Sequence, residues 1–461
     1  MRGFAAGLNP AQVRELKLDP DVASVVPDRY VHATAEVYPT GIRRIRASID
    51  WSANPASAVN VAVIDTGIDL ASTDLNAVSG TNCVNPGSPA NDDNGHGTHV
   101  AGTIAARGDN GSGVVGVVPG TTVYAVKVLD RRGSGTWSQV ICGIDWVTAN
   151  TVADNIQVAN MSLGGSGTSA DMNSCGDSTA LHEAICSSTG RVAYAVAAGN
   201  SGWDFDDASA PDVPAAYPEV LTVAAMSDSD GQPGAGGPKP SCRTGEYDDR
   251  YASFSNWAAT AGGRAHTLAA PGVCILSDWI GGGTNTISGT SMATPHVVGA
   301  IAHCDGDVGG PAGVCAGLTN PADLIPEISS TEPSYGFYGD PFQPVSGRFY
   351  GYEALAGPQP PAATTAPDFT LSALPASQAI NRGARTTFVV AIAPSSTYNV
   401  NLSVSGLPAR TSASFSPNPA TTSSTLTVST NKRSSAGTYT LTIAGTSGGV
   451  TRMTNVTLTL R

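Results

Sequence analysis

Two histidines lie three residues apart where a glycine-containing segment leads into a run of small apolar residues, in NDDNGHGTHVAGTIAA at 91–106. His96 and His99 permit three interpretations: a pair of metal ligands on one helical face, two buried structural imidazoles, or one proton-transferring base beside a packed neighbour. The paired-histidine zinc motif carries a glutamate directly after its first histidine, and Gly97 stands there instead, so the metal interpretation is weak. The rest of the chain must decide between the other two.

Three more polar residues lie where an apolar segment ends or a helix begins. Asp65 ends the apolar run VNVAVID, where it would bring a carboxylate to a sheet edge, although an aspartate that caps a turn would look the same. Ser291, in ISGTSMATPHVVGAIAH, opens an expected helix whose amino end would stabilise an oxyanion, with an ordinary N-cap as the alternative. Asn200 follows the apolar AVAAG and either forms a turn or donates its amide N–H to a developing negative charge.

The elements that must position these residues alternate between short apolar strands and helices. Strands covered on both faces are predicted at 59–65, 122–129, 156–162, 191–200 and 220–226. Helical spacing predicts helices at 138–150 and 178–188. This order predicts an α/β domain with a parallel sheet and right-handed crossovers, in which chemistry gathers at the carboxyl ends of the strands.

A segment rich in proline, alanine and threonine, residues 357–368, predicts a linker between two regions of different composition. Beyond it, stretches such as TSSTLTVST and GTYTLTIAGTS alternate apolar residues with serine or threonine, which predicts an all-β, immunoglobulin-like sandwich over 369–461. This region contains no cysteine, tryptophan or histidine. We therefore expect it to bind or to space rather than to catalyse.

Composition and charge narrow the function classes. The formal net charge of −13 argues against electrostatic binding of nucleic acid or of an anionic membrane, which are both polyanions. No window approaches the roughly 18 consecutive apolar residues of a membrane span. The opening MRGFAAGLNPAQVREL lacks the continuous apolar core of a signal peptide, so a secreted protein would have lost its leader from this sequence.

Eight cysteines, an even number, indicate four disulfides and an oxidising, extracellular compartment, with buried free thiols as the alternative. No C-x-x-C spacing suggests a zinc or redox site. Cys175 with Cys186 and Cys304 with Cys315 are expected to pair because they are close in sequence. The other four cysteines permit three pairings, and we favour Cys242 with Cys274 among them. Cys83 and Cys142 would then form the fourth pair.

Five motifs, taken in order, resemble the subtilisin family of serine proteases: VAVIDTGID, GHGTHVAGTIAA, SLGGSG, AAGNSG and GTSMATPHVVGAIA. The order Asp, His, Ser is the one known for this family. The resemblance implies a parallel-sheet catalytic domain at 35–356. It also implies four catalytic roles: a nucleophile, Ser291; a general base, His96; an orienting carboxylate, Asp65; and a side-chain oxyanion donor, Asn200.

On this interpretation the second histidine of the opening stretch is not catalytic. His99 is one turn further into the helix and is followed by apolar residues, so we expect it to belong to the packed face and to make a fixed hydrogen bond. The segment NMSLGGSG (160–167) resembles the family's substrate-binding edge, which pairs with an extended peptide as an added strand. The resemblance implies six substrate contacts: Ser162, Leu163, Gly164, Gly165, Ala197 and Gly199.

These small residues predict an open primary pocket without a charged floor. We therefore expect medium or large uncharged side chains to be preferred over lysine and arginine there. A second resemblance concerns residues 1–34, which look like the latter half of the family's inhibitor-like α+β propeptide, with a helix at NPAQVRELKLD and a strand at VASVVPD. It implies self-cleavage near Thr34 and Ala35, a propeptide that acts as chaperone and inhibitor, and a first half that is missing from the sequence.

Together these resemblances imply a secreted, self-maturing and monomeric serine endopeptidase that hydrolyses proteins through an acyl-enzyme. Two alternatives stay open: a processing or peptide-joining enzyme of narrow specificity, and a surface-binding protein whose tail carries the main function. No cofactor and no catalytic metal are expected. Structural calcium is typical of the family, and the acidic segment DDASAPDVPAAYP (206–218) is the candidate site.

Overall fold

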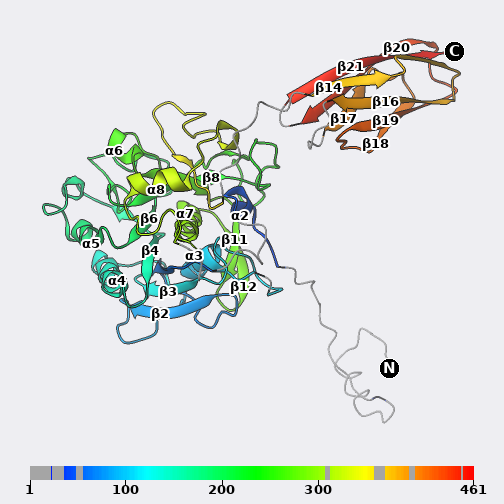
Figure 1. Ribbon diagram of the computed structural model, residues 1–461. Helices are drawn as coiled ribbons and strands as arrows, with labels where there is room; N and C mark the ends of the chain where they lie inside the picture. Colours follow the sequence, from blue (N-terminus) through cyan, green and yellow to red (C-terminus); the bar gives the residue numbers. More distant parts are fainter. Residues whose placement is uncertain are drawn as a thin grey trace.

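The computed structural model describes residues 22, 36–47, 56–108, 110–306, 312–357, 369–393, 400–447 and 450–461 (Figure 1). Three expectations therefore lie outside the described residues, except that residue 22 begins the expected propeptide strand. These are the helix and strand of the propeptide, the self-cleavage position at Thr34 and Ala35, and the linker beyond Gly357.

A nine-stranded sheet forms the centre of residues 36–357. Its strand order is β13-β10-β8-β6-β4-β1-β3-β2, with β9 added antiparallel to β8, and all other pairs are parallel. The five predicted strands are confirmed within this sheet. The strands are β1 (Asn60–Asp65), β2 (Asn76–Asn82), β3 (Thr122–Lys127), β4 (Ile156–Met161), β6 (Ala193–Ala197), β8 (Leu221–Ser227), β9 (Arg250–Tyr251), β10 (Thr267–Pro271) and β13 (Tyr352–Glu353).

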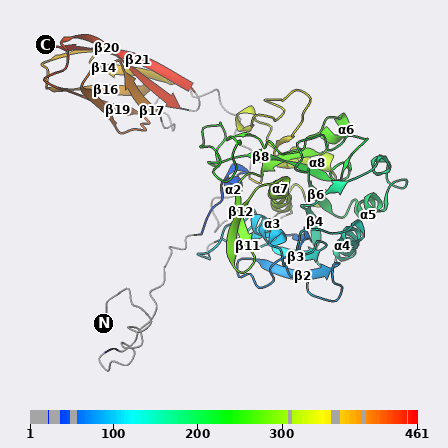
Figure 2. The same cartoon turned by 180° about the vertical axis from the view of Figure 1, so that it is seen from behind.

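Helices cover both faces of the sheet, as Figures 1 and 2 show from opposite sides. Alternate residues of β1 belong to different hydrophobic cores, because successive side chains of a strand point to opposite faces. Val61 and Val63 pack with α3 (His96–Ala105), α7 (Thr290–Cys304) and α8 (Pro321–Ile328). Ala62 and Ile64 pack with α4 (Trp137–Asn150) and α5 (Ala180–Ser188), which confirms the two helices predicted by spacing.

Short elements and four disulfides complete this part of the chain. All eight cysteines are paired, as Cys83–Cys142, Cys175–Cys186, Cys242–Cys274 and Cys304–Cys315, which confirms the three expected pairs and settles the fourth. The strands β5 (Gly165–Ser166) and β7 (Asp212–Val213) form a small antiparallel pair, as do β11 (Ile275–Trp279) and β12 (Gly283–Ile287). The remaining short helices are α2 (Thr40–Arg44), η2 (Ser169–Met172), α6 (Ala261–Arg264) and η3 (Pro333–Tyr335).

The C-terminal region is built from two four-stranded sheets, ordered β14-β16-β19-β18 and β15-β21-β20-β17. Their pairs are antiparallel except β15 with β21, and a common core containing Phe388, Leu426 and Ile443 lies between the sheets. The predicted β-sandwich is thus confirmed, and its immunoglobulin-like relationship stays a prediction. The strands are β14 (Thr370–Leu374), β15 (Ser377–Ile380), β16 (Arg385–Ala393), β17 (Asn401–Ser405), β18 (Thr411–Ser416), β19 (Ser423–Thr430), β20 (Gly437–Ser447) and β21 (Val450–Leu460).

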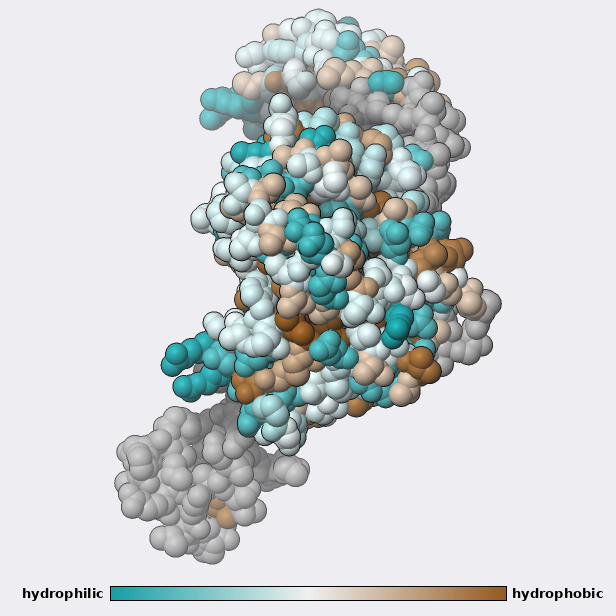
Figure 3. Space-filling view, turned by 90° about the vertical axis from the view of Figure 1, so that its left-hand side faces the viewer, coloured by the Kyte–Doolittle hydropathy of each residue, from teal (hydrophilic) through white to brown (hydrophobic). Residues whose placement is uncertain are grey.

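The face in Figure 3 carries mostly pale and hydrophilic residues with scattered apolar ones. Within the described ranges, none of the helices combines the length and the apolar character that crossing a bilayer requires.

Candidate active site

His96 and Asp65 form a close pair at the carboxyl edge of the sheet. Asp65 is the last residue of β1 and is fully buried, and His96 is the first residue of α3. The Nδ1 atom of His96 lies 2.8 Å from Oδ1 and 3.0 Å from Oδ2 of Asp65. Asp65 Oδ1 also accepts a hydrogen bond from the backbone N–H of Thr66 at 2.7 Å. This arrangement fixes the ring of His96 and directs Nε2 away from the carboxylate.

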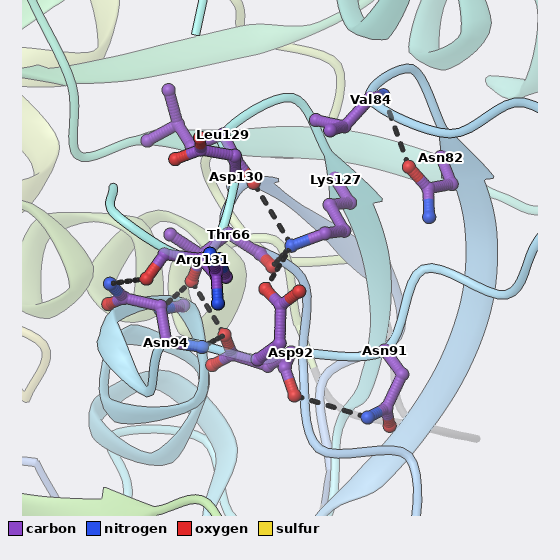
Figure 4. Close-up of polar contacts among 12 residues, drawn as sticks. Thr66, Asn82, Val84, Asn91, Asp92, Asn94, Lys127, Leu129, Asp130 and Arg131 are labelled. Atoms are coloured by element: carbon purple, nitrogen blue, oxygen red, sulfur yellow. Dashed lines mark hydrogen bonds and ion pairs between the residues drawn. The ribbon is translucent and has the colours of Figure 1, made fainter. Parts of the chain in front are cut away.

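A second aspartate, which the sequence analysis did not single out, holds the turn before His96. Asp92 is buried and its Oδ1 accepts from the Thr66 hydroxyl at 2.9 Å and from the backbone N–H groups of Asn94 and Gly95. Figure 4 shows Asp92 and the buried Lys127 on either side of Thr66, whose carbonyl oxygen accepts from Lys127 Nζ at 2.6 Å. Hydrogen bonds to Asp92 therefore connect the end of β1 to the start of α3. The acidic stretch NDDNG resembles a solvated loop, so its sequence carried no signal for this role.

The two histidines of the opening stretch have opposite electrostatic environments. The side chain of His96 is 26% exposed. Burial lowers its pKa, but the charge and hydrogen bond of Asp65, together with the charge of Asp92, outweigh this and raise the pKa above the ordinary histidine value. His99 is fully buried, its Nε2–H donates to Ile275 O at 3.0 Å, and burial lowers its pKa to about 4. The packed, hydrogen-bonded role predicted for His99 is confirmed.

Ser291 lies at the amino end of α7, as predicted. It is the second residue of the helix, where backbone N–H groups have no partner within the helix. The Ser291 hydroxyl donates to Ser162 O at 3.2 Å, and the Ser162 hydroxyl donates to Ser291 O at 2.7 Å. These reciprocal bonds join the end of β4 to the start of α7.

Asn200 lies beside the same helix end. Its Oδ1 accepts from the backbone N–H of Thr290 at 2.8 Å and from the Thr290 hydroxyl at 3.1 Å. These bonds fix the orientation of the amide and make Nδ2 its donor at the cavity that Asn200 and Ser291 both line.

Two adjoining cavities bring the predicted residues together. His96 and Trp137 line a cavity of about 840 Å³, and Ser291 and Asn200 line one of about 330 Å³. The segment 163–166 lines both. Each residue predicted to contact substrate lines at least one of them: Ser162, Leu163, Gly164, Gly165, Ala197 and Gly199.

The expectation of an uncharged primary pocket is wrong. Asp212 lines the smaller cavity beside Ser291 and Asn200. It is brought there because β7, which begins with Asp212, pairs with β5 and places Asp212 opposite Ser166. Asp212 lies twelve positions after Asn200, so no local motif links them. The larger cavity carries a charge of the other sign, from Arg132.

A histidine held by a buried aspartate, a serine at a helix amino end in the adjoining cavity and a doubly covered parallel sheet are features of serine hydrolases. Residues 56–306 match the model of the subtilase family, peptidase S8, and residues 1–34 match that of peptidase inhibitor I9. The chain therefore belongs to the subtilase family of serine peptidases and begins with a segment of the inhibitor type.

Individual relatives agree with this assignment. Subtilisin E of Bacillus subtilis is 41% identical over 300 residues, which cover 65% of this chain and 69% of that protein. An alkaline protease of Shouchella clausii is 38% identical over 298 residues, 64% of this chain and 67% of that protein. The crystal structure of a cold adapted subtilisin-like serine proteinase superposes with a TM-score of 0.50 at 30% identity, covering 70% of this chain and 99% of that one.

Proposed function

We propose that Ser291, His96, Asp65 and Asn200 are the catalytic residues of this peptidase. The Ser291 hydroxyl attacks the scissile carbonyl while Nε2 of His96 takes its proton, and the same nitrogen then protonates the leaving amine. Asp65 holds Nδ1–H of His96, which keeps Nε2 as the base and stabilises the imidazolium. Asn200 Nδ2 and the backbone N–H of Ser291 stabilise the oxyanion, and water then hydrolyses the acyl-enzyme.

The contact between Asp65 and His96 carries this proposal. A buried carboxylate against Nδ1 raises the pKa of the ring and leaves Nε2 to exchange protons at the cleft. In the free enzyme Ser291 donates to Ser162 O, so its hydroxyl has to rotate towards His96 when substrate binds. Hydrogen bonds of catalytic groups commonly shorten only in the complex with substrate.

Replacement of the nucleophile tests the proposal. We expect Ser291→Ala to lose turnover of casein and of short peptides and to leave the N-terminal segment uncleaved. Ser138→Ala, which removes an exposed hydroxyl that lines neither cavity, is the matched control and should retain turnover. Full activity of the Ser291→Ala variant would refute the assignment.

We also propose the division of the chain. Residues 1–34 form part of a propeptide removed by self-cleavage near Thr34 and Ala35, residues 35–356 the peptidase domain, 357–368 a linker and 369–461 a sandwich that binds or spaces. The four disulfides support secretion, because such bonds persist in oxidising compartments. We propose a monomer that acts on peptides and binds no nucleic acid. The mass of the mature protein, compared with that of Ser291→Ala, tests the cleavage position.

A subtilase needs no organic cofactor, and calcium is the structural ion we propose. Within the described ranges, the acidic side chains of 206–218 do not form a group of three or more potential metal ligands. Asp228, Asp230 and Asp248 instead offer carboxylate oxygens within 4.8 Å of one another, a donor set that suits a hard cation. These three aspartates are the ligands we propose.

Chelation tests this site without reference to activity. We expect EDTA to lower the thermal unfolding midpoint of the Ser291→Ala protein and added calcium to restore it. The shift should shrink in Asp230→Asn and persist in Asp207→Asn, which removes an exposed carboxylate outside the group. Equal shifts in both variants would exclude Asp230 as a ligand.

A further inference from the structure

The smaller cavity contains one charged side chain beside the proposed nucleophile. It is lined by Ser291, Asn200, Ala197 and Trp203 among others, and Asp212 alone of its lining residues carries a formal charge. When Ser291 attacks a carbonyl and Asn200 receives its oxyanion, the side chain of the residue that bears this carbonyl has to lie next to both. That side chain therefore enters the cavity that contains Asp212.

Asp212 is held rigidly at this position. It begins β7, its backbone N–H donates to Phe205 O at 2.9 Å, and its Oδ2 accepts from Asn256 Nδ2 at 3.0 Å. Asn256 is buried, and its Oδ1 accepts from the backbone N–H groups of Ser201 and Trp203 at 3.0 and 3.2 Å. One buried amide thus connects the carboxylate to the turn that follows Asn200.

Two glycines leave the carboxylate accessible from the cavity. A Cβ atom on Gly199, whose φ is +100°, would lie 2.5 Å from Oδ2 of Asp212. A Cβ on Gly164 would lie 3.3 Å from Oδ1. Both glycines line the cavity, so a larger residue at either position would fill the space beside the carboxylate.

No cation of the described chain neutralises Asp212. Within the described ranges, the ion pairs formed by lysine, arginine and histidine do not include it. Burial raises the pKa of Asp212 to about 6, although hydrogen bonds from the Trp203 and Asn256 side chains lower it. At neutral pH the carboxylate is therefore ionised, partly desolvated and without a countercharge, a state that a ligand cation would stabilise.

We infer that Asp212 makes this enzyme selective for lysine or arginine at the residue that contributes the scissile carbonyl. The inference rests on the proposed function, because it requires Ser291 to be the nucleophile. The ammonium or guanidinium group would pair with Asp212 between Gly164 and Gly199, and the aliphatic stem would lie along the apolar wall. A glutamate or aspartate at the same place would be repelled.

Matched peptides that differ only at that residue test the inference. Lysine and norleucine have stems of the same length and differ in the ammonium group. A charge-assisted hydrogen bond contributes enough to raise kcat/KM for lysine about 10- to 100-fold over norleucine. Asp212→Asn should bring this ratio close to unity, whereas Asp207→Asn, which removes an exposed charge from the same segment, should retain the wild-type ratio.

The pH dependence of the same ratio provides a readout that needs no variant. Lysine selectivity should fall as the pH drops through about 6, where Asp212 becomes protonated. His96 lies in the neighbouring cavity and its titration affects both peptides alike, so it cancels in the ratio. Asp204 and Asp206, in the same segment, bond instead to the backbone N–H of Ala259.

The outcomes separate the inference from the proposed function. If the wild-type enzyme cleaves the norleucine peptide as efficiently as the lysine peptide, or if Asp212→Asn keeps the lysine preference, the inference is wrong and the catalytic assignment stands. If none of the peptides is cleaved and a fluorophosphonate leaves Ser291 unmodified, the proposed function fails and the inference fails with it.

Discussion

The active-site cleft and the interior around Arg44 both contain buried carboxylates that face a basic side chain, but they differ in access and in chemistry. In the cleft, fully buried Asp65 contacts a histidine that is 26% exposed. In the interior, the Arg44 side chain is fully buried, with Nε 3.0 Å from Asp249 Oδ1 and a terminal nitrogen 3.5 Å from Glu353 Oε2. Histidine can exchange a proton near neutral pH, whereas arginine cannot.

The contacts of Arg44 show what the second arrangement does. This residue ends α2, donates to Tyr335 O at 3.0 Å and packs its guanidinium over the Tyr335 ring at 5.0 Å. Burial raises the pKa of Glu353, and the positive charge of Arg44 opposes that rise. On the proposed mechanism, the same combination of a carboxylate and a basic group serves proton transfer where solvent and substrate can reach it. Where they cannot reach it, around Arg44, the combination holds distant segments together.

Loss of the carboxylate in the cleft should have the largest effect. Asp65→Asn keeps the shape of the side chain but favours the wrong histidine tautomer, so we expect kcat to fall about 10⁴-fold, as for the corresponding change in other serine proteases. Steady-state kinetics on a peptide substrate measure this, with the exposed Asp177→Asn as the control. A kcat within the range of the control would show that Asp65 does not orient the base.

Loss of the interior cation should act on stability instead. Arg44→Met leaves Asp249 and Glu353 buried without their partner, so we expect the free energy of unfolding to fall by about 3–5 kcal/mol. Urea unfolding in a Ser291→Ala background, which prevents self-digestion, measures the loss. Arg43→Met changes an exposed arginine of the same helix and should have little effect. Equal losses in the two variants would contradict the comparison.

The pH dependence should be the smallest effect and should have opposite signs for rate and stability. Catalysis needs neutral His96, whose pKa is raised, so kcat/KM should fall about tenfold per pH unit below a pKa that lies above the ordinary histidine value. The ion pair of protonated His96 with Asp65 stabilises the folded protein. This stabilisation is fully present below the pKa of His96 in the unfolded chain, and it is lost as the pH rises through the higher pKa of His96 in the folded protein. If kcat/KM and the free energy of unfolding both rose, or both fell, as the pH increased through this range, the raised pKa of His96 would be contradicted.

Sequence reasoning recovered the elements whose signal is local. The five buried strands are mostly apolar, Asp65 ends one of them and Asn200 lies just beyond another, so the sheet edge was predictable from short stretches. His99 was placed correctly because apolar residues surround it along the helix. The role of Asp92 in the turn before His96 was missed. An aspartate that accepts hydrogen bonds from backbone N–H groups cannot be distinguished in sequence from an aspartate exposed to solvent.

The charge of the cavity beside Ser291 could not be predicted, because it depends on pairing between segments that are separate in sequence. Asp212 reaches it through two-residue strands, β5 and β7, which are too short to show a periodic pattern. Arg44 likewise meets Asp249 and Glu353 only after folding, across 205 and 309 residues of sequence. The small residues of the SLGGSG and AAGNSG motifs predicted an open pocket. They carried no information about Asp212, which lines it.

The most direct test of the catalytic assignment is to treat the protein with a fluorophosphonate and to locate the modified residue by peptide mass spectrometry. We predict a single modification on the peptide that contains Ser291, and its loss in His96→Ala. Modification of a different serine, or undiminished modification of Ser291 without the imidazole of His96, would contradict the account.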